Sequence, residues 1–517
     1  GGYFAHRELG RVMQINSESL RFILGIKVKQ HRQAAGLSLK QLGERTSLSI
    51  SYLSEIEKGK KYPKPEKIIQ LAQGLGVSFD ELVSLQLDDE LNPVTALLNS
   101  PLFNDFPLKQ FGIGLSDVFD LVTDSPSKAG AFVRTLLEIG RGYDMQVEHF
   151  LLASLRSYQK MHLNYFEEIE GQAEAFRARY PTDEPMISLD WLESLLLDQY
   201  QCRVSYDDFS ATPELQTLRS LCVSPNKLVV NSRLMPQQQK FVLAKEIGYR
   251  FLELEERALT SSWIKVESFE QVHNNFRASY FAGALLIPEM ALLTDLKAWL
   301  ANKEFDGDAL SRMMDQYDAT PEMFVYRMSQ LMPHHLGLHK MHYMRLHNKA
   351  GVDRFHIAKE LNTTTVFTPR GIGPSEHHCR RWVAIGLLNE VGERQAAGED
   401  PKLAVSAQRS HFIAQNQTFF NIAVVRPLSL GQNSNTGMAL GFLMDERFND
   451  TVAFGEDPAV PQMDVHETCE RCPLTDCASR VAEPTLHNSQ QQQLDREQAL
   501  QTYLDHHQAQ STLQDSH

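Results

Sequence analysis

The chain has 517 residues, too many for a single hydrophobic core, so several domains are expected. Its hydrophobic fraction of 42% is that of a globular protein and excludes a largely disordered chain. The longest apolar stretch, 281–293, is short and interrupted by Pro288, so it predicts no membrane span, and no segment has the pattern of a secretion signal. We expect a multidomain, cytoplasmic protein that does not engage a membrane.

The net charge of −14 is unevenly distributed along the chain. Residues 21–84 contain eleven Lys and Arg against six Asp and Glu, a balance of +5, so the rest of the chain carries −19. Because Lys and Arg neutralise phosphates, a small basic module on an acidic body suits a DNA-binding domain attached to a sensory part. A solvated charged surface is the alternative. Residues 1–12 precede Met13, have no periodic pattern and are interpreted as an expression remnant.

Residues 20–84 are predicted to form five short helices. The second begins after Ser38, with Gln41 three residues later, which is the spacing of a capping box. A third runs from about Ile50 to Lys58 and ends at Gly59. The expected core positions of the first, third, fourth and fifth helices are Leu24, Val28, His31, Leu53, Ile56, Ile68, Leu71, Ala72, Leu75, Phe79 and Leu82.

The segment GLSLKQLGERTSLSISYLSEIEKGKKYPKPEKIIQLAQGLGVSFDEL resembles the lambda-repressor-type helix-turn-helix of the XRE family. In such modules the second helix of the pair places its first side chains on base edges in the major groove. The resemblance implies base or nearby contacts for Lys40, Ser49, Ser51, Tyr52 and Ser54, and phosphate contacts for Ser38, Lys58, Lys60, Lys61 and Tyr62. A helical bundle that binds protein is the alternative.

Helix-turn-helix modules of this kind usually pair on double-stranded DNA, so a homodimer is expected, with its interface elsewhere in the chain. Residues 86–180 are interpreted as a helical linker and dimerisation region. Within them, an apolar stripe has the spacing of a helix that buries one face, as domain core or as a dimer seam. This stripe consists of Ala129, Phe132, Val133, Leu136 and Leu137.

Residues 181–335 change pattern: strand-like pieces at 202–206 and 227–231 precede two helices, FVLAKEIGYRFLEL and NNFRASYFAGALLIP. This order resembles the zincin-like α+β fold of ImmA/IrrE-type zinc peptidases, in which His-Glu-x-x-His supplies two metal ligands and a general base. Here Lys245 and Tyr249 stand where the histidines are expected, and Asn275 where a carboxylate is expected. These side chains cannot hold zinc at neutral pH, so we predict an inactive peptidase scaffold and not an enzyme.

The same region is predicted to bind a small molecule in the vacated cleft. It resembles regulators of short-chain fatty-acid and propionate metabolism, which respond to acyl-coenzyme A. The resemblance implies coenzyme A or a short-chain acyl-CoA as effector. Five residues on or beside the two helices would suit such an anionic, phosphate-bearing molecule: Lys245, Arg250, Arg257, Arg277 and Tyr280. As an alternative, these cations pair with carboxylates such as Glu253, Glu255 and Glu256.

Cys469, Cys472 and Cys477 have the spacing C-x2-C-x4-C, which lets three thiolates converge on one metal centre. The resemblance to the same regulators implies Cys379 as the fourth ligand and a [4Fe-4S] cluster as cofactor. A structural zinc ion remains open, as do His378 or His466 as the fourth ligand and free thiols without metal.

Residues 336–482 alternate apolar and polar side chains, which predicts an antiparallel sheet in a C-terminal α+β sensor domain that carries the cysteine cluster. The tail 483–517 is rich in Gln, Asp and His and is predicted to be disordered or only partly helical. The expected fold is therefore multidomain, mainly α with α+β parts.

Taken together, the sequence predicts a sequence-specific DNA-binding transcription regulator controlled by a short-chain acyl-CoA and an iron-sulfur cluster. A zinc-stabilised or purely redox-sensing XRE regulator without acyl-CoA control is the main alternative. A metallopeptidase is disfavoured by the residues at 245 and 249, and a thioesterase by the lack of a nucleophile elbow in the sequence.

Overall fold

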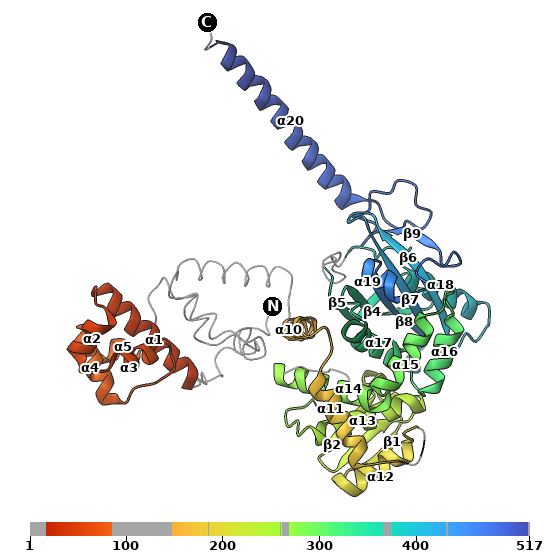
Figure 1. Cartoon of the computed structure of the whole chain (residues 1–517), viewed down its shortest axis with the longest axis horizontal. Helices are drawn as coiled ribbons and strands as arrows, with labels where there is room; N and C mark the ends of the chain where they lie inside the picture. Colours follow the sequence, from red (N-terminus) through yellow and green to blue (C-terminus); the bar gives the residue numbers. More distant parts are fainter. Residues whose placement is uncertain are drawn as a thin grey trace. The chain divides into compact units, whose positions relative to one another are not determined.

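A computed structural model describes residues 17–84, 147–182, 184, 186–258, 260, 268–364, 373, 375–430 and 433–514. The chain divides into two compact units, residues 1–158 with 267–269, and residues 159–266 with 270–517. Figure 1 colours the described elements along the sequence. The predicted apolar stripe at 129–137 and the expression remnant at 1–12 lie outside the described residues.

The first unit contains the five predicted helices, drawn in red to orange in Figure 1. They are α1 (Ser17–Ala34), α2 (Leu39–Thr46), α3 (Ile50–Glu57), α4 (Pro65–Leu75) and α5 (Phe79–Val83). Their common core consists largely of the predicted apolar positions: Leu24, Val28, Leu42, Leu53, Ile56, Ile68, Leu71, Ala72, Leu75 and Leu82. Phe79, which was expected to be buried, is 38% exposed, because it begins the short α5 and Leu82 fills the core instead.

Polar contacts fix these helices against one another. The capping box at Ser38 is confirmed: the Gln41 amide donates to Ser38 Oγ at 3.2 Å, and the Ser38 amide donates to Gln41 Oε1 at 2.8 Å. Buried Lys27 donates from α1 to the carbonyl of Glu81 in α5 at 2.7 Å. Arg32 forms a two-pronged ion pair with Glu57 of α3, at 2.6 and 3.0 Å. Two of the basic residues of this module therefore stabilise its interior.

The second unit begins with helices and a small sheet. It includes the end of α10 (Val147–Met161), then α11 (Glu167–Arg179) and α12 (Leu189–Tyr200). The predicted strands are present as β1 (Arg203–Asp207) and β3 (Lys227–Asn231), which pair in parallel. Between them come two 3-10 turns, η1 (Phe209–Ala211) and η2 (Pro213–Leu215), and a strand that sequence analysis missed, β2 (Ser220–Ser224), antiparallel to β3.

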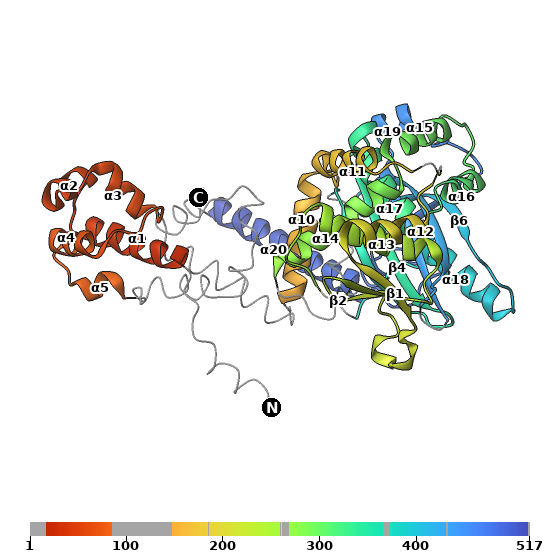
Figure 2. The ribbon, with the colours of Figure 1, turned by 90° about the horizontal axis from the view of Figure 1, so that it is seen from below.

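Five helices follow this small sheet. The two predicted ones are α13 (Pro236–Phe251) and α14 (Phe269–Leu286). The next three are α15 (Glu289–Leu300), α16 (Gly307–Gln316) and α17 (Pro321–Leu336). Figure 2 shows α13 and α14 beside α11 and α17, so these two helices are packed between other helices of the same unit.

A six-stranded sheet confirms the predicted alternation in the C-terminal part. Its order is β5-β4-β8-β7-β6-β9, antiparallel except for the β6–β9 pair. The strands are β4 (Met341–Lys349), β5 (Phe355–Asn362), β6 (Ala404–Phe412), β7 (Gln417–Pro427), β8 (Ser434–Leu443) and β9 (Gln462–Val465), with α18 (Val383–Ala396) and α19 (Glu446–Thr451) between them. One face packs on α15–α17 and the other on α18, so alternate β4 side chains belong to different cores (Figure 2).

The predicted disorder of residues 483–517 is wrong for most of that segment, because Thr485–Gln514 form the helix α20 (Figure 1). The segment is rich in Gln and also contains several Leu, and both are good helix formers. Side chains four residues apart also pair along it, as in the bond from Gln491 to Asp495 at 2.9 Å and from Gln501 to Asp505 at 2.8 Å.

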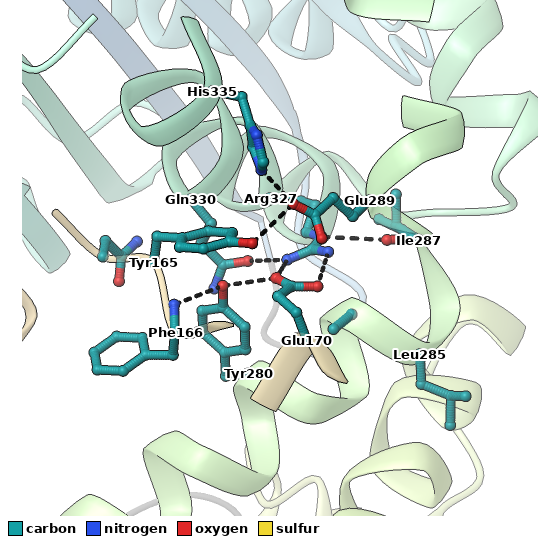
Figure 3. A network of polar contacts seen from close by, with 12 residues as sticks. Tyr165, Phe166, Glu170, Tyr280, Leu285, Ile287, Glu289, Arg327, Gln330 and His335 are labelled. Carbon is teal, nitrogen blue, oxygen red and sulfur yellow. Dashed lines mark hydrogen bonds and ion pairs between the residues drawn. The ribbon is translucent and has the colours of Figure 1, made fainter. Parts of the chain in front are cut away.

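A buried ion pair joins three helices of the second unit (Figure 3). Arg327 of α17 is 1% exposed and donates to Glu170 of α11 at 2.5 and 2.8 Å. The Tyr280 hydroxyl of α14 donates to the same carboxylate at 2.7 Å. Because the two charges are almost fully removed from water, each requires the other.

Replacing Arg327 by Met is expected to lower the free energy of unfolding by about 3–5 kcal/mol, because the Glu170 charge would remain buried without its partner. Urea denaturation followed by circular dichroism measures this change. Lys340→Met is the control: it removes a largely exposed cation that lies 3.1 Å from Asp445, and it should cost less than about 1 kcal/mol. Equally small losses in both variants would contradict the structural role of the buried pair.

Candidate functional sites

All ten residues predicted to contact DNA lie on α2 or α3, at the N-caps of these helices, or in the segment that follows α3. Ser49 caps α3 by accepting the Tyr52 amide at 3.2 Å, so the first turn of this helix carries the predicted base-contacting side chains. Tyr52 and Ser54 are half-buried, and the remaining eight are exposed: Ser38, Lys40, Ser49, Ser51, Lys58, Lys60, Lys61 and Tyr62. A free helix N-terminus with exposed polar side chains can bind phosphates and base edges.

Glu55, which sequence analysis did not include, partly neutralises the positive charge of this surface. Lys61 lies 3.5 Å from the Glu55 carboxylate, and its ammonium is 5.2 Å from the centre of the Tyr52 ring. Lys58 and Lys60 are the more available cations for a DNA phosphate, because in the described part of the chain no carboxylate pairs with either of them.

In the second unit, the three residues at the expected metal-ligand positions contact one another. The Lys245 ammonium of α13 donates to Asn275 Oδ1 of α14 at 2.5 Å, and the Tyr249 hydroxyl donates to the same oxygen at 3.4 Å. Burial, together with the positive charges of Arg257 and Arg219, lowers the pKa of Lys245 to about 7. Burial raises the pKa of Tyr249. This trio holds the two helices together by hydrogen bonds where a peptidase would use a metal ion.

The remaining peptidase residue, Glu246, is 2% exposed and held by two arginines. Arg257 donates to both of its oxygens at 2.9 and 2.7 Å, and Arg250 donates to one of them at 3.0 Å. Although burial raises the pKa of Glu246, these hydrogen bonds and charges outweigh it and leave that pKa below its usual value. Because its pKa is lowered and both of its oxygens are occupied by arginines, this carboxylate is a poor general base.

Of the five residues predicted to bind the effector, the structure brings three together. Lys245, Arg250 and Arg257 gather around Glu246 and Asn275. Arg277 faces elsewhere and lies 3.6 Å from Glu168, while Tyr280 is buried and bonded to Glu170. The carboxylate that engages Arg250 and Arg257 is the buried Glu246.

Sequence analysis missed three cations that the fold brings to Lys245 from other segments. Arg219 immediately precedes β2, and Arg345 and Lys359 are register partners on β4 and β5. The signal was weak: β4 reads MHYMRLHNK, with a charge at alternate positions, but nothing in the sequence connects it to α13.

The four cysteines predicted as ligands line one small cavity. Cys379, Cys469, Cys472 and Cys477 share it with His466, Arg380, Arg381 and Arg480. The two cysteine segments are joined by backbone bonds, since the Cys469 amide donates to the carbonyl of His377 at 3.0 Å and the Cys379 amide to that of Glu467 at 3.1 Å. Within the described residues, no group of three or more His, Cys, Asp or Glu side chains is arranged to hold a metal ion.

The surroundings of the cavity are well ordered by hydrogen bonds. Arg480 donates to the carbonyls of Cys469 at 2.8 Å and Cys472 at 3.1 Å, which shapes the loop between the cysteines. Burial raises the pKa of the Cys379 and Cys472 thiols and lowers the pKa of His466 to about 4. His466 Nδ1 is buried and has no hydrogen-bond partner in the part of the chain that is described. An imidazole nitrogen without a partner therefore lines the same cavity as the four thiols.

Residues 28–82 match the family model for helix-turn-helix domains, and residues 198–329 match the model for IrrE N-terminal-like domains. The chain therefore contains a helix-turn-helix domain and an IrrE-like domain, which confirms both resemblances. Among the described helices, none alone is long and apolar enough to cross a membrane. Only α14 and α15 taken together, bent by 67°, meet the length and composition criteria.

Among known proteins, the chain is similar to the propionyl-CoA carboxylase regulator of Cereibacter sphaeroides, with 25% identity over 327 residues, 59% of this chain and 64% of that protein. It is also 36% identical over 58 residues to an uncharacterized HTH-type transcriptional regulator of Mycobacterium tuberculosis, covering 11% of this chain and 41% of that protein. The alignment thus spans less than two thirds of either relative. A solved Mycobacterium tuberculosis transcriptional regulator aligns with a TM-score of 0.43 and 19% identity over 63% of this chain and 92% of that one.

The low pKa of Lys245 predicts a pH-dependent stability. The folded chain releases the Lys245 proton at about pH 7, whereas the unfolded chain retains it up to its ordinary pKa of 10.5. Between these values the unfolded state binds more protons, so the contribution of Lys245 to stability improves as the pH rises; below pH 7 both states are protonated and the full cost of burying the charge is present.

Lys245→Met should therefore stabilise the chain, relative to wild type, by roughly 2–3 kcal/mol more at pH 6.5 than at pH 9. Urea unfolding at the two pH values measures this difference, with the exposed Lys297→Met as control. Wild-type and Lys245→Met stability profiles that run parallel with pH would show that Lys245 is not buried as a charge.

Proposed function

We propose that this chain is a DNA-binding transcription regulator that acts as a homodimer in the cytoplasm. The observation that carries the proposal is the helix-turn-helix domain with its exposed, polar α3 N-terminus, in a chain related to proteins named as transcription regulators. The helix-turn-helix domain binds double-stranded DNA through phosphate contacts from Lys58 and Lys60 and base contacts from the first turn of α3.

The effector that we propose is coenzyme A or a short-chain acyl-CoA. The name of the Cereibacter sphaeroides relative connects it to propionyl-CoA metabolism, and the cations around Lys245 suit a phosphate-bearing ligand. Arg250 and Arg257, which are held by Glu246, act as support for the site, and Lys245 is the member of this set that faces the additional cations. We assign the IrrE-like domain no catalytic role, because Lys245, Tyr249 and Asn275 are not zinc ligands and already satisfy one another.

The cofactor that we propose is a [4Fe-4S] cluster held by Cys379, Cys469, Cys472 and Cys477. Four thiols on one cavity match its ligand number, and nearby Arg380, Arg381 and Arg480 suit its negative charge. A zinc ion needs its sulfurs at about 2.3 Å from a single point, whereas a cubane distributes them over four iron atoms and so holds them farther apart. Structural zinc is the competing assignment.

The first test concerns DNA. The full chain should select specific fragments from a random-sequence pool, and propionyl-CoA should change its affinity for them. Lys60→Ala should weaken binding to selected and random duplexes alike and reduce the salt dependence of log K by about one unit, because one phosphate contact is lost. Fluorescence anisotropy over a salt series measures both effects.

Lys67→Ala, on α4 of the same domain, is the matched control and should leave the salt dependence unchanged. If the chain binds selected and random duplexes equally, with or without propionyl-CoA, the proposal that it is a transcription regulator is wrong. A loss in Lys60→Ala confined to the selected sequence would instead reassign Lys60 to base recognition.

The second test concerns the cofactor. Wild-type chain purified without oxygen should be brown and contain about four iron atoms. Cys472→Ser should lose most of the colour and iron, whereas Cys222→Ser, buried in β2 away from the cavity lining, should retain them. Elemental analysis and visible absorption measure this, and stoichiometric zinc without iron in the wild type would establish the competing assignment.

A further inference from the structure

Four cations from separate segments of the second unit form a cluster in which no member has an ion pair with a carboxylate among the described residues. Lys245 lies on α13, Arg219 precedes β2, Arg345 lies on β4 and Lys359 on β5. We refer to these four residues as the cation cluster.

Mutual electrostatic effects show that the members of the cation cluster are close together. Burial lowers the pKa of Lys359 well below its usual value, and the charges of Arg345 and Lys245 add to this effect. Burial and the charge of Arg345 lower the pKa of Arg219 to about 10. Arg219 in turn contributes to the low pKa of Lys245. Arg219, Lys245 and Arg345 thus each make a neighbouring cation harder to charge, which is costly in the free protein.

The register of the sheet places Arg345 and Lys359 side by side on the same face. Arg345 and Lys359 are directly opposite on adjacent strands, an arrangement of like charges that is destabilising unless something lies between them. Both share a sheet face with Tyr343, because side chains alternate along a strand. The Lys359 ammonium lies 3.3 Å from the centre of the Tyr326 ring, so an aromatic face forms part of the surroundings.

The nearest acids already have partners. Glu246 is held by Arg250 and Arg257, and Glu322 accepts from Arg426 at 2.7 and 3.2 Å. Arg345 Nε is buried and has no hydrogen-bond partner among the residues that the structure describes. Arg345 is half-buried, and a buried guanidinium nitrogen without an acceptor, beside other cations, lacks the hydrogen-bond partner that such groups normally have in proteins.

We propose that the cation cluster binds a phosphate or diphosphate group of a small-molecule ligand, with Arg345 as its central donor. Guanidinium groups bind phosphate oxygens through two parallel hydrogen bonds, and an anion placed here would relieve the repulsion among all four cations. The assignment to coenzyme A phosphates rests on the proposed function; the preference for a phosphate does not.

This site would join two parts of the unit through one ligand. Lys245 belongs to a helix of the IrrE-like domain, whereas Arg345 and Lys359 belong to the C-terminal sheet. A phosphate bound between them would hold α13 and β4 at a fixed separation. Ligand binding would therefore affect the position of the C-terminal sheet as well as that of α13.

Isothermal titration of the full chain tests this inference with four probes: propionyl-CoA, ADP, pyrophosphate and a propionyl-pantetheine thioester without phosphates. The three phosphate compounds should bind, and the pantetheine thioester should bind at least about tenfold more weakly than propionyl-CoA. ADP and pyrophosphate distinguish a general phosphate site from one that requires the whole of coenzyme A.

Arg345→Gln and Lys359→Gln should each weaken pyrophosphate and propionyl-CoA binding by about tenfold or more, because each removes a charged donor. Both variants should also melt at a higher temperature than wild type in the absence of ligand, since one repelling charge is gone. Arg312→Gln, an exposed arginine on α16 paired with Asp306, is the matched control and should change neither property.

Wild-type affinities in Arg345→Gln and Lys359→Gln would overturn the inference, as would a lower melting temperature without ligand in both, or a wild-type chain that binds none of the phosphate probes. These outcomes can be distinguished from a failure of the proposed function. If the chain binds DNA selectively but binds none of the phosphate probes, the proposed DNA-binding function stands and the phosphate site is wrong. If the chain binds phosphates but its DNA affinity does not change, the phosphate site stands and the proposed regulation by the ligand is wrong.

Discussion

The carboxylate of Glu246 is the constraint on which the second unit depends. It is almost fully buried, so it must be neutralised, and Arg250 and Arg257 do this with hydrogen bonds of 2.7–3.0 Å. Because residues four apart share one face of a helix, the Glu246–Arg250 pair fixes the rotation of α13 and turns Lys245 and Tyr249 together toward Asn275. The IrrE-like domain thereby balances its buried carboxylate with its own arginines.

The ion pairs of Glu246 do not neutralise all of the positive charge in this region. Glu246 and Glu322 form ion pairs with arginines outside the cation cluster. The four members of the cation cluster come from four segments and act on one another electrostatically. Proteins retain such an arrangement at a cost in stability, and residues kept at a cost commonly serve binding. If the proposed anion site is present, it depends on Lys245, which stands where a peptidase of this fold would have a histidine ligand.

Local signals in the sequence predicted the local structure. Capping at Ser38 and periodic apolar residues located α2–α4, and strand alternation predicted the C-terminal sheet. Tyr280 was assigned to the cleft only because it shares a helix with Asn275; five residues correspond to about 140° around the axis, so it faces α11 instead. Arg345 could not be found in this way, because about a hundred residues separate it from Lys245 and only tertiary packing brings them together.

The strand that carries Arg345 also connects the two candidate sites of this unit. Arg345 lies on one face of β4, and on the other face Met344 and Leu346 belong to the same hydrophobic core as Cys379. An anion at Arg345 and a cofactor at Cys379 would thus act on opposite sides of one strand. Such proximity produces regulation only if each ligand has a different affinity for two arrangements of that strand, and then each must change the affinity of the other by the same factor. Reciprocity of this kind separates true coupling from two ligands that merely stabilise the same core.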